Sequence, residues 1–236
     1  MNPISQFEEK ISSFYSQFLL NAGYFAAGEA QLRSFPPNYS VQVTFNPNEA
    51  SGKIPMAELR SHSDAVQLSI SELFQIKAIA AWNDLLTELF SHYVSLHFDG
   101  TPVPLLGAQT AKINFSASDD VSIQVKDSII DNFSFQTYAI RISTIRKIID
   151  SVDATKEHLA IVRKHVSIRN ATQHHDGRVY EKMCSELGIA ALSVLNSDGM
   201  EVKIALGEKI PIASSEINVL KSTLLKIAAT WKLQLS

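Results

Sequence analysis

The chain has 236 residues, of which 45% are hydrophobic and 19% are charged, so it is long enough to bury a core in one large domain or two small ones. Its formal charge of −3 excludes an overall basic field, and any contact with nucleic acid must therefore depend on a local patch. The only cysteine, Cys184, excludes an internal disulfide and the zinc-ribbon spacings, and it favours a reducing compartment.

The first predicted element is an amphipathic helix over residues 4–21. Its apolar residues recur at alternating steps of three and four, which is the period of one helical stripe. Asn21-Ala22-Gly23 predicts a stop, after which residues 24–32 resume as a second helical piece that ends before Pro36-Pro37. Apolar and polar residues then alternate over 41–45 and again over 66–70, which predicts two short strands.

The longest helix is predicted to begin at the capping box Ser69-Ile70-Ser71-Glu72 and to end at Phe98. Its apolar positions cover a wide arc, as in a central bundle helix, and Trp82 is expected in the core. A β-hairpin is expected next over residues 113–125, with its turn at Ser116-Ala117-Ser118-Asp119-Asp120.

Two consecutive helices are predicted to follow, and a short connection at 151–153 makes them antiparallel neighbours. The second of them is expected to stop at Asp176-Gly177. A short helical stretch to Gly188 precedes a hairpin whose turn is Asn196-Ser197-Asp198-Gly199, and the last helix starts at Ser214 or Ser215.

These elements predict a mainly α (α+β) protein, an antiparallel helical bundle with inserted short β-hairpins in a single domain over residues 1–236. The bundle core is expected at about 4–33, 71–98, 134–187 and 214–232, and the β insertions at about 39–70, 104–127 and 191–212. The first residues show no targeting segment and no stretch is apolar enough to span a bilayer, so we expect a cytoplasmic protein with no membrane contact.

The chemically most informative run is Arg169-Asn170-Ala171-Thr172-Gln173-His174-His175. A guanidinium stays charged and fits a phosphate through forked donors, while an imidazole gives or takes a proton near neutral pH, so the run indicates phosphate chemistry without a metal or cofactor. Five residues correspond to about 140° around a helix, so Arg169 and His174 diverge on a rigid helix. Three arrangements remain open: the arginine swings back, the helix frays before Gly177, or two protomers pair an arginine with a histidine.

A mildly basic surface surrounds this run. We take Arg163, Lys164 and Arg178 as nucleic-acid-binding residues, and Arg141, Arg146 and Lys147 can extend the patch from the preceding helix. The alternative for all of them is a solvated helix face without a ligand. His92 and His97 lie five residues apart, which is not the same-face spacing of a metal pair, so no metal site is expected there.

The pattern Arg169-Asn170-x-x-x-His174-x-x-Gly177 resembles the motif of HEPN domains, the higher eukaryote and prokaryote nucleotide-binding superfamily, and in particular bacterial toxin and defence members. The resemblance covers roughly residues 154–232 and includes the glycine that ends the helix and the hairpin after it. It departs at Thr172 and Gln173, which stand where many members are apolar, and in the strand-rich regions of the N-terminal half.

The resemblance implies a dimer that brings two motif helices together and, in many members, metal-independent endoribonuclease activity. By this comparison Arg169 stabilises phosphate charge, Asn170 orients a group, His174 is the acid or base, and His175 is a possible second one. RNA, a second copy of the chain and an antitoxin or defence-system protein are the expected partners. The alternative is a non-catalytic HEPN-like module that binds RNA, a nucleotide or a protein, and a plain bundle in which Arg169 and Asn170 brace the Gly177 turn is the third possibility.

Overall fold

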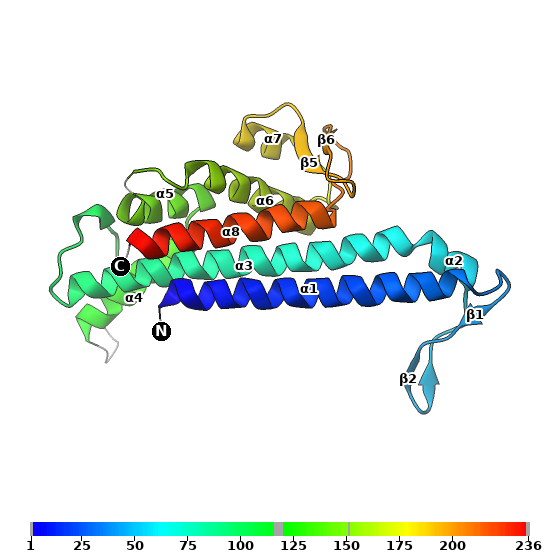
Figure 1. Cartoon of the computed structure of the whole chain (residues 1–236). Coiled ribbons are helices and arrows are strands. Elements are labelled where there is room, and N and C mark those ends of the chain that lie inside the picture. Colours follow the sequence, from blue (N-terminus) through cyan, green and yellow to red (C-terminus); the bar gives the residue numbers. More distant parts are fainter. Residues whose placement is uncertain (1, 116–119, 151, 235–236) are drawn as a thin grey trace. The chain divides into compact units, whose positions relative to one another are not determined.

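Helices dominate the chain in the computed structural model, which describes residues 2–115, 120–150 and 152–234 (Figure 1). Within these ranges the helical elements are α1 (Pro3–Arg33), α2 (Met56–Ser61), α3 (Ser63–Phe98), the short 3-10 helix η1 (Pro104–Leu106), α4 (Val121–Ser134), α5 (Tyr138–Ile149), α6 (Lys156–His174), α7 (Glu181–Leu187) and α8 (Ser214–Gln234). The strands are β1 (Ser40–Val41), β2 (Thr44–Asn46), β3 (Glu49–Ala50), β4 (Ile54–Pro55), β5 (Leu192–Leu195) and β6 (Glu201–Ile204). They form three antiparallel pairs, β1 with β4, β2 with β3 and β5 with β6, and the predicted mainly α fold with short hairpins is confirmed.

The chain divides into two compact units. The first contains residues 1–11, 78–166 and 220–236, and the second contains residues 12–77 and 167–219. The helices α1, α3, α6 and α8 contribute residues to both units.

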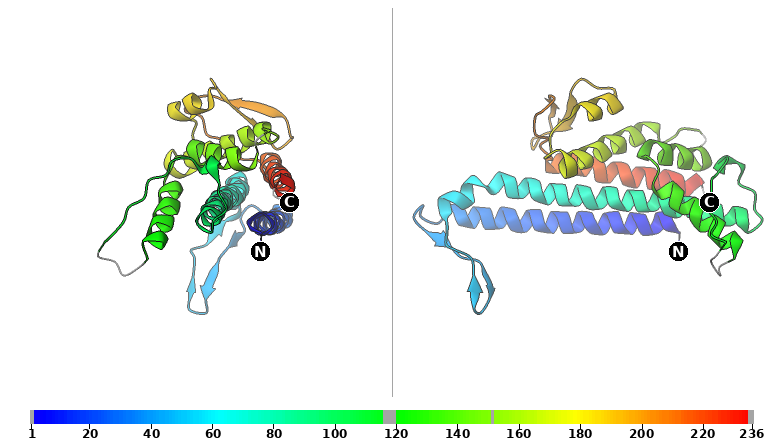
Figure 2. Two further views of the ribbon diagram at one scale, coloured as in Figure 1. Left: turned by 90° about the vertical axis from the view of Figure 1, so that its left-hand side faces the viewer. Right: turned by 180° about the vertical axis from the view of Figure 1, so that it is seen from behind.

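Aromatic side chains lie in the core of the first unit, together with aliphatic ones. Trp82 of α3 is fully buried, as predicted, and its ring centroid lies 5.3 Å from that of Trp231 in α8 and 5.9 Å from that of Phe7 in α1. In this unit Figures 1 and 2 show the corresponding stretches of α1, α3 and α8 side by side. Phe90 and Phe133 stack at 3.9 Å between centroids and join α4 to α3. Burial of such large rings removes a large apolar area from water and so stabilises this unit.

A buried polar cluster in the first unit fixes the start of α6. The side chain of Asp150 accepts hydrogen bonds from the backbone N–H groups of Ala154 (2.8 Å) and Thr155 (2.9 Å) and from the hydroxyl of Thr155. The indole N–H of Trp231 donates to the same hydroxyl over 3.3 Å, and Gln234 donates to Asp150 over 3.4 Å. Asp150 and Thr155 are each 1% exposed, so this cluster satisfies polar groups that burial would otherwise make costly.

The second unit has its own apolar core and one tight hairpin. Phe18 of α1 and Phe74 of α3 lie 5.6 Å apart between ring centroids. In the hairpin Leu192 pairs with Ile204 and Val194 with Val202, and the connecting turn places Gly199 at φ 75°. The Asp-Gly turn predicted from the sequence is therefore confirmed.

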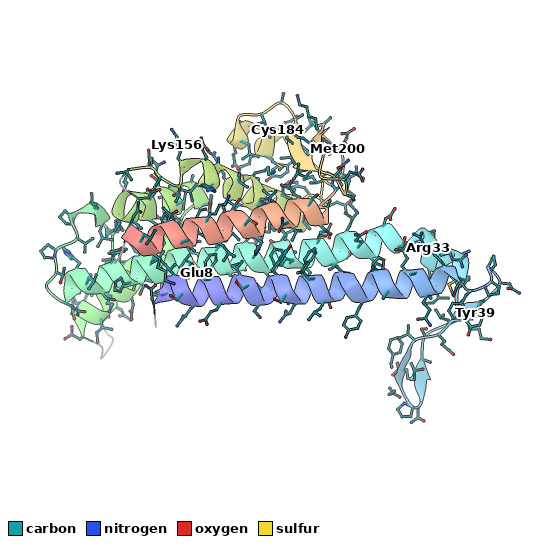
Figure 3. All side chains as sticks on the ribbon, viewed as in Figure 1. Glu8, Arg33, Tyr39, Lys156, Cys184 and Met200 are labelled. Carbon is teal, nitrogen blue, oxygen red and sulfur yellow. The ribbon has the colours of Figure 1, made fainter. Side chains whose placement is uncertain are left out.

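An extended arm leaves the helices of the second unit between α1 and α2. It consists of β1 to β4, residues 40–55, and Figures 1 and 2 show the β2–β3 pair pointing away from α1. Figure 3 shows Arg33 at the end of α1 and Tyr39 just before the arm. Two apolar side chains of the arm are exposed, Val43 by 49% and Phe45 by 64%.

The predicted stop at Asn21-Ala22-Gly23 is wrong, because α1 continues to Arg33 without interruption. A Cβ added at Gly23 would meet nothing within 4 Å, so this glycine marks no close approach or turn. Residues 24–32 include three alanines and also Glu29, Gln31 and Leu32, all residue types that favour a continuing helix.

The strand predicted at 66–70 is also wrong, and so is the helix start predicted at Ser69. The long helix α3 begins at Ser63, directly after α2, and ends at Phe98 as predicted. The hydroxyl of Ser69 donates to the backbone carbonyl of Ala65 at 2.9 Å, which is a bond inside a helix and not an N-terminal cap. The β insertion expected over 39–70 is therefore confined to residues 40–55.

The β insertion expected over 104–127 is absent from the described residues of that region. Residues 104–106 form η1, and Val121 onward forms α4, whose cap is the side chain of Asp120 accepting from the Ser122 N–H at 2.7 Å. The alternating residues Val121 and Ile123 lie on an exposed part of this helix, while Ile129 and Phe133 carry its buried face. Residues 116–119 of the predicted turn lie outside the described residues.

Candidate functional site

The polar run lies in the last turns of α6, which belong to the second unit. Ser167, Ile168 and Ala171 are buried and anchor this part of the helix. Arg169 and Asn170 are half-buried, and His174 is exposed as the last residue of α6. Since α6 remains helical through His174, fraying between Arg169 and His174 does not occur.

Asn170 holds the guanidinium of Arg169. Nη1 of Arg169 donates to Oδ1 of Asn170 over 3.2 Å, so the long arginine side chain bends along the helix toward its neighbour. Nε of Arg169 is buried and has no hydrogen-bond acceptor among the described residues. The guanidinium is therefore positioned by one amide while part of its set of donors stays unsatisfied.

Shortly after α6 ends at His174, two consecutive residues have a left-handed backbone conformation. Asp176 has φ 51° and Gly177 has φ 67°, which confirms the predicted stop. The carbonyl of Ala171 accepts the N–H groups of both His175 (2.8 Å) and Gly177 (3.0 Å), so the chain reverses closely around it. The glycine is required here by its φ and not by space, because a Cβ would meet only Cε of Lys209, at 3.7 Å.

The segment after the motif is held by the connection between the β5–β6 hairpin and α8. The N–H of Val179 donates to the carbonyl of Glu208 at 3.0 Å, and the N–H of Ile210 donates to the carbonyl of Gly177 at 2.8 Å. Arg178 adds to this: its Nη1 donates to the Gly207 carbonyl at 2.9 Å, and its Nε lies 3.7 Å from Oδ2 of Asp176. Arg178, one of the residues expected to bind nucleic acid, therefore stabilises this turn by contacts within the chain and remains half-exposed.

The two adjacent histidines have different surroundings. The ring of His175 stacks on Tyr180, with 3.8 Å between centroids and 20° between planes. Partial burial raises the pKa of the Tyr180 hydroxyl, so that side chain is neutral. His174 is exposed and takes part in no ring contact or side-chain hydrogen bond within the described ranges. Both imidazoles are exposed, and they differ in that the ring of His175 is stacked on Tyr180.

Arg163 and Lys164 also lie on α6, but in the first unit. Arg163 is exposed and lines a pocket with α5, and Lys164 is half-buried. The expectation that Arg141 extends a basic surface is wrong: this residue is 8% exposed, and its Nη2 donates to the Asn83 carbonyl (2.6 Å) and the Thr87 hydroxyl (2.7 Å). Its burial lowers the pKa of the guanidinium.

Sequence reasoning missed two contributors to this end of α6. Tyr180, which packs on His175, follows a turn whose path depends on the left-handed residues 176 and 177, so no local pattern indicated the stacking. The backbone of residues 207–210, which pairs with residues 177–179, is distant in sequence and carries no motif. Both contacts fix the backbone directly after His174.

The chemistry available at this site is proton transfer and anion binding. An exposed imidazole and an oriented guanidinium lie on one helical turn and a half, and no carboxylate hydrogen-bonds to Arg169 in the part of the chain that the structure describes. In the same residues no group of three His, Cys, Asp or Glu side chains is arranged to hold a metal ion. None of the described helices combines the length and apolar character needed to cross a bilayer.

Comparisons with protein-family models, with curated proteins and with solved structures find no match to this chain.

Proposed function

We propose that the chain is a metal-independent endoribonuclease that acts as a dimer, with Arg169, Asn170 and His174 at its active site. The observation that carries the proposal is the different exposure of the polar groups at the end of α6: an exposed imidazole follows a half-buried guanidinium that an amide holds in place. The resemblance of the same three residues to the HEPN motif supports this assignment.

Arg169 is assigned to the phosphate. RNA cleavage by the neighbouring 2′-hydroxyl passes through a crowded phosphorane with additional negative charge, which a fixed cation stabilises. The bond from Arg169 to Asn170 keeps the guanidinium from turning freely, so less conformational entropy is lost when a phosphate binds. Asn170 is therefore a positioning residue in this proposal.

His174 is assigned to proton transfer. In the reaction the 2′-oxygen attacks the adjacent phosphorus and loses its proton to a base, while the bond from phosphorus to the 5′-oxygen breaks and that oxygen takes a proton from an acid. The products are a 2′,3′-cyclic phosphate and a 5′-hydroxyl end. An exposed imidazole with no competing ring contact can serve as either group.

A second copy of the chain supplies the second proton-transfer group. The reaction needs one acid and one base, and within a protomer the ring of His175 is stacked on Tyr180, which restricts how that ring can turn toward a phosphate. A two-fold dimer in which two α6 ends face each other brings two His174 imidazoles to one phosphate and pairs each with an arginine of the other protomer. This arrangement also overcomes the divergence of Arg169 and His174 on one helix.

Cleavage of bulk RNA in the presence of EDTA tests the proposal. The parent protein is expected to yield 2′,3′-cyclic phosphate ends, and His174→Ala and Arg169→Ala are each expected to lower the rate by about 10²-fold or more. His158→Ala, at the opposite end of the same helix, is the matched histidine control and should keep the parent rate. Intact RNA with the parent protein, under conditions where it is folded, contradicts the nuclease assignment.

Light scattering of the same preparations tests the dimer. The active parent is expected at the mass of two chains. RNA that is bound but not cut, with binding lost in Arg169→Ala, would instead support the non-catalytic RNA-binding module. A folded monomer that cuts RNA at the full rate contradicts the two-protomer site.

A further inference from the structure

A pocket in the first unit lies between α5 and the first half of α6, and the ribonuclease proposal does not use it. Its volume is about 270 Å³, close to the lower end of the range of about 300–1,000 Å³ in which small-molecule sites usually fall. The pocket therefore suits a compact ligand. Its lining comes from consecutive turns of two helices, which gives it a defined shape.

Three cations line this pocket, Arg146 from α5 and Lys156 and Arg163 from α6. Lys156, at the first turn of α6, is exposed (Figure 3). Nε of Arg146 lies 3.3 Å from Oδ1 of Asp153, so a carboxylate lies beside that cation. No carboxylate is among the described residues that line the pocket, so its lining side chains offer cations and no anion to a ligand.

Apart from Ser143, the remaining wall is mostly apolar. It includes Ile142 and Leu159, two alanines and the ring of Tyr138. The indole N–H of Trp82 donates to the Tyr138 hydroxyl over 3.3 Å, which holds the ring against α3 of the same unit. Burial raises the pKa of Tyr138, so the hydroxyl is neutral and adds no negative charge to the wall.

We propose that this pocket binds a small organic phosphate, with the phosphate group at Lys156 and Arg163 and a compact apolar or planar body against Ile142, Leu159 and Tyr138. The forked donors of an arginine match a phosphate, and a neighbouring ammonium adds a second charge-assisted contact. The apolar wall distinguishes the ligand from inorganic phosphate, because a body packed there buries apolar surface. The two chemistries lie within one pocket of one unit.

Titration calorimetry with phenyl phosphate as the probe tests this site on the full chain. Phenyl phosphate is expected to bind more tightly than inorganic phosphate, and uncharged benzyl alcohol is expected to show no binding at the same concentrations. Arg163→Gln and Lys156→Gln should each lower the affinity for phenyl phosphate by about tenfold or more, since each removes a charge-assisted contact. Lys147→Gln, a charge change on the exposed side of α5 outside the lining, is the matched control and should leave binding unchanged.

A variant that fills the pocket distinguishes binding at a defined site from non-specific attraction to surface charge. Ala160 lies in the lining and is exposed, so Ala160→Leu places a larger side chain in the cavity without disturbing the core. In this variant the affinity for phenyl phosphate should fall by about tenfold or more, while the affinity for inorganic phosphate stays the same. Circular dichroism and a thermal melt confirm that each variant is folded.

Three results overturn the proposal: no binding of phenyl phosphate at millimolar concentration, equal weakening by Lys147→Gln and Arg163→Gln, or binding of a short RNA without binding of the small phosphate. None of these readouts depends on RNA cleavage. Failure of the phosphate site is thus separate from failure of the ribonuclease assignment.

Discussion

The two ends of α6 use polar side chains in opposite ways. At its start Asp150 and Thr155 are buried and satisfy one another, together with the indole of Trp231. At its end Arg169 is half-buried with an unsatisfied Nε, and His174 is exposed. The same helix therefore has a polar cluster that stabilises the fold at one end and a polar cluster available to a ligand at the other.

This difference separates stability from activity. Removal of a buried acceptor leaves buried donors without partners, which destabilises the folded state and lowers the free energy of unfolding. Removal of an exposed side chain changes the free energy of unfolding little, although it can abolish chemistry. Variants at the two ends of α6 should consequently have effects of different kinds.

The largest effect on stability is expected from Asp150→Asn. The amide has the shape of the carboxylate but has only one acceptor oxygen, so it cannot accept from Ala154 and Thr155 as the carboxylate does. We expect a loss of about 2–4 kcal/mol in the free energy of unfolding, measured by urea denaturation.

Asp153→Asn is the matched control for that variant. Asp153 is 51% exposed and pairs with Arg146 at 3.3 Å, so its loss is expected to cost less than about 0.5 kcal/mol. Equal losses in the two variants would show that the buried cluster contributes no more than a surface ion pair.

Gly177→Ala is expected to have the next largest effect. Gly177 has φ 67°, and a side chain in this left-handed region costs about 1–2 kcal/mol. In Gly28→Ala the opposite sign is expected: Gly28 lies within α1, a Cβ there meets nothing within 4 Å, and alanine favours a helix by about 0.5–1 kcal/mol. Thermal melts of both variants give the two signs, and stabilisation by Gly177→Ala would contradict the geometry of the helix end.

A smaller effect is expected from pH at the start of α6. Burial acts to raise the pKa of Asp150, but hydrogen bonds from Thr155, Ala154 and Gln234 outweigh it and lower that pKa below its usual value. A carboxyl with a lowered folded pKa stabilises the protein above its unfolded pKa of about 3.9, and this stability is lost as the pH falls through the folded pKa. The stability difference between the parent and Asp150→Asn should therefore be largest near neutral pH and shrink at strongly acidic pH.

The smallest effect on stability is expected from His174→Ala at the exposed end. Its side chain supports no buried contact, and the change in free energy of unfolding should stay within about 0.5 kcal/mol. A larger loss in urea denaturation would mean that this imidazole braces the fold and is not free for a ligand.

The fold could be predicted from the sequence where one local signal decided the outcome. The stripes of α5 and α8 and the Asp198-Gly199 turn of the β5–β6 hairpin are such signals. At residues 121–125 alternation over only five residues fitted a strand, but the decisive features were the Asp120 cap and the buried Ile129 and Phe133 one and two turns later. A short alternating run therefore needs the longer helical period beside it before it indicates a strand.

The candidate site was predictable in its residue types but not in its contacts. The spacing of Arg169, Asn170 and His174 and the stop at Gly177 follow from the sequence. The hydrogen bond from Arg169 to Asn170 and the stack of His175 on Tyr180 depend on side-chain directions and on the left-handed turn, which adjacent residues do not reveal. The different surroundings of the two histidines consequently required the structure.

The central claim is that the unstacked imidazole of His174, and not the stacked imidazole of His175 beside it, carries the chemistry at the end of α6. The direct test compares the rates of RNA cleavage in EDTA of the parent, His174→Ala and His175→Phe, in which phenylalanine keeps an aromatic ring against Tyr180. We predict a loss of about 10²-fold or more for His174→Ala and a rate within a few-fold of the parent for His175→Phe. Equal rates for the parent and His174→Ala, or a loss confined to His175→Phe, would contradict the claim.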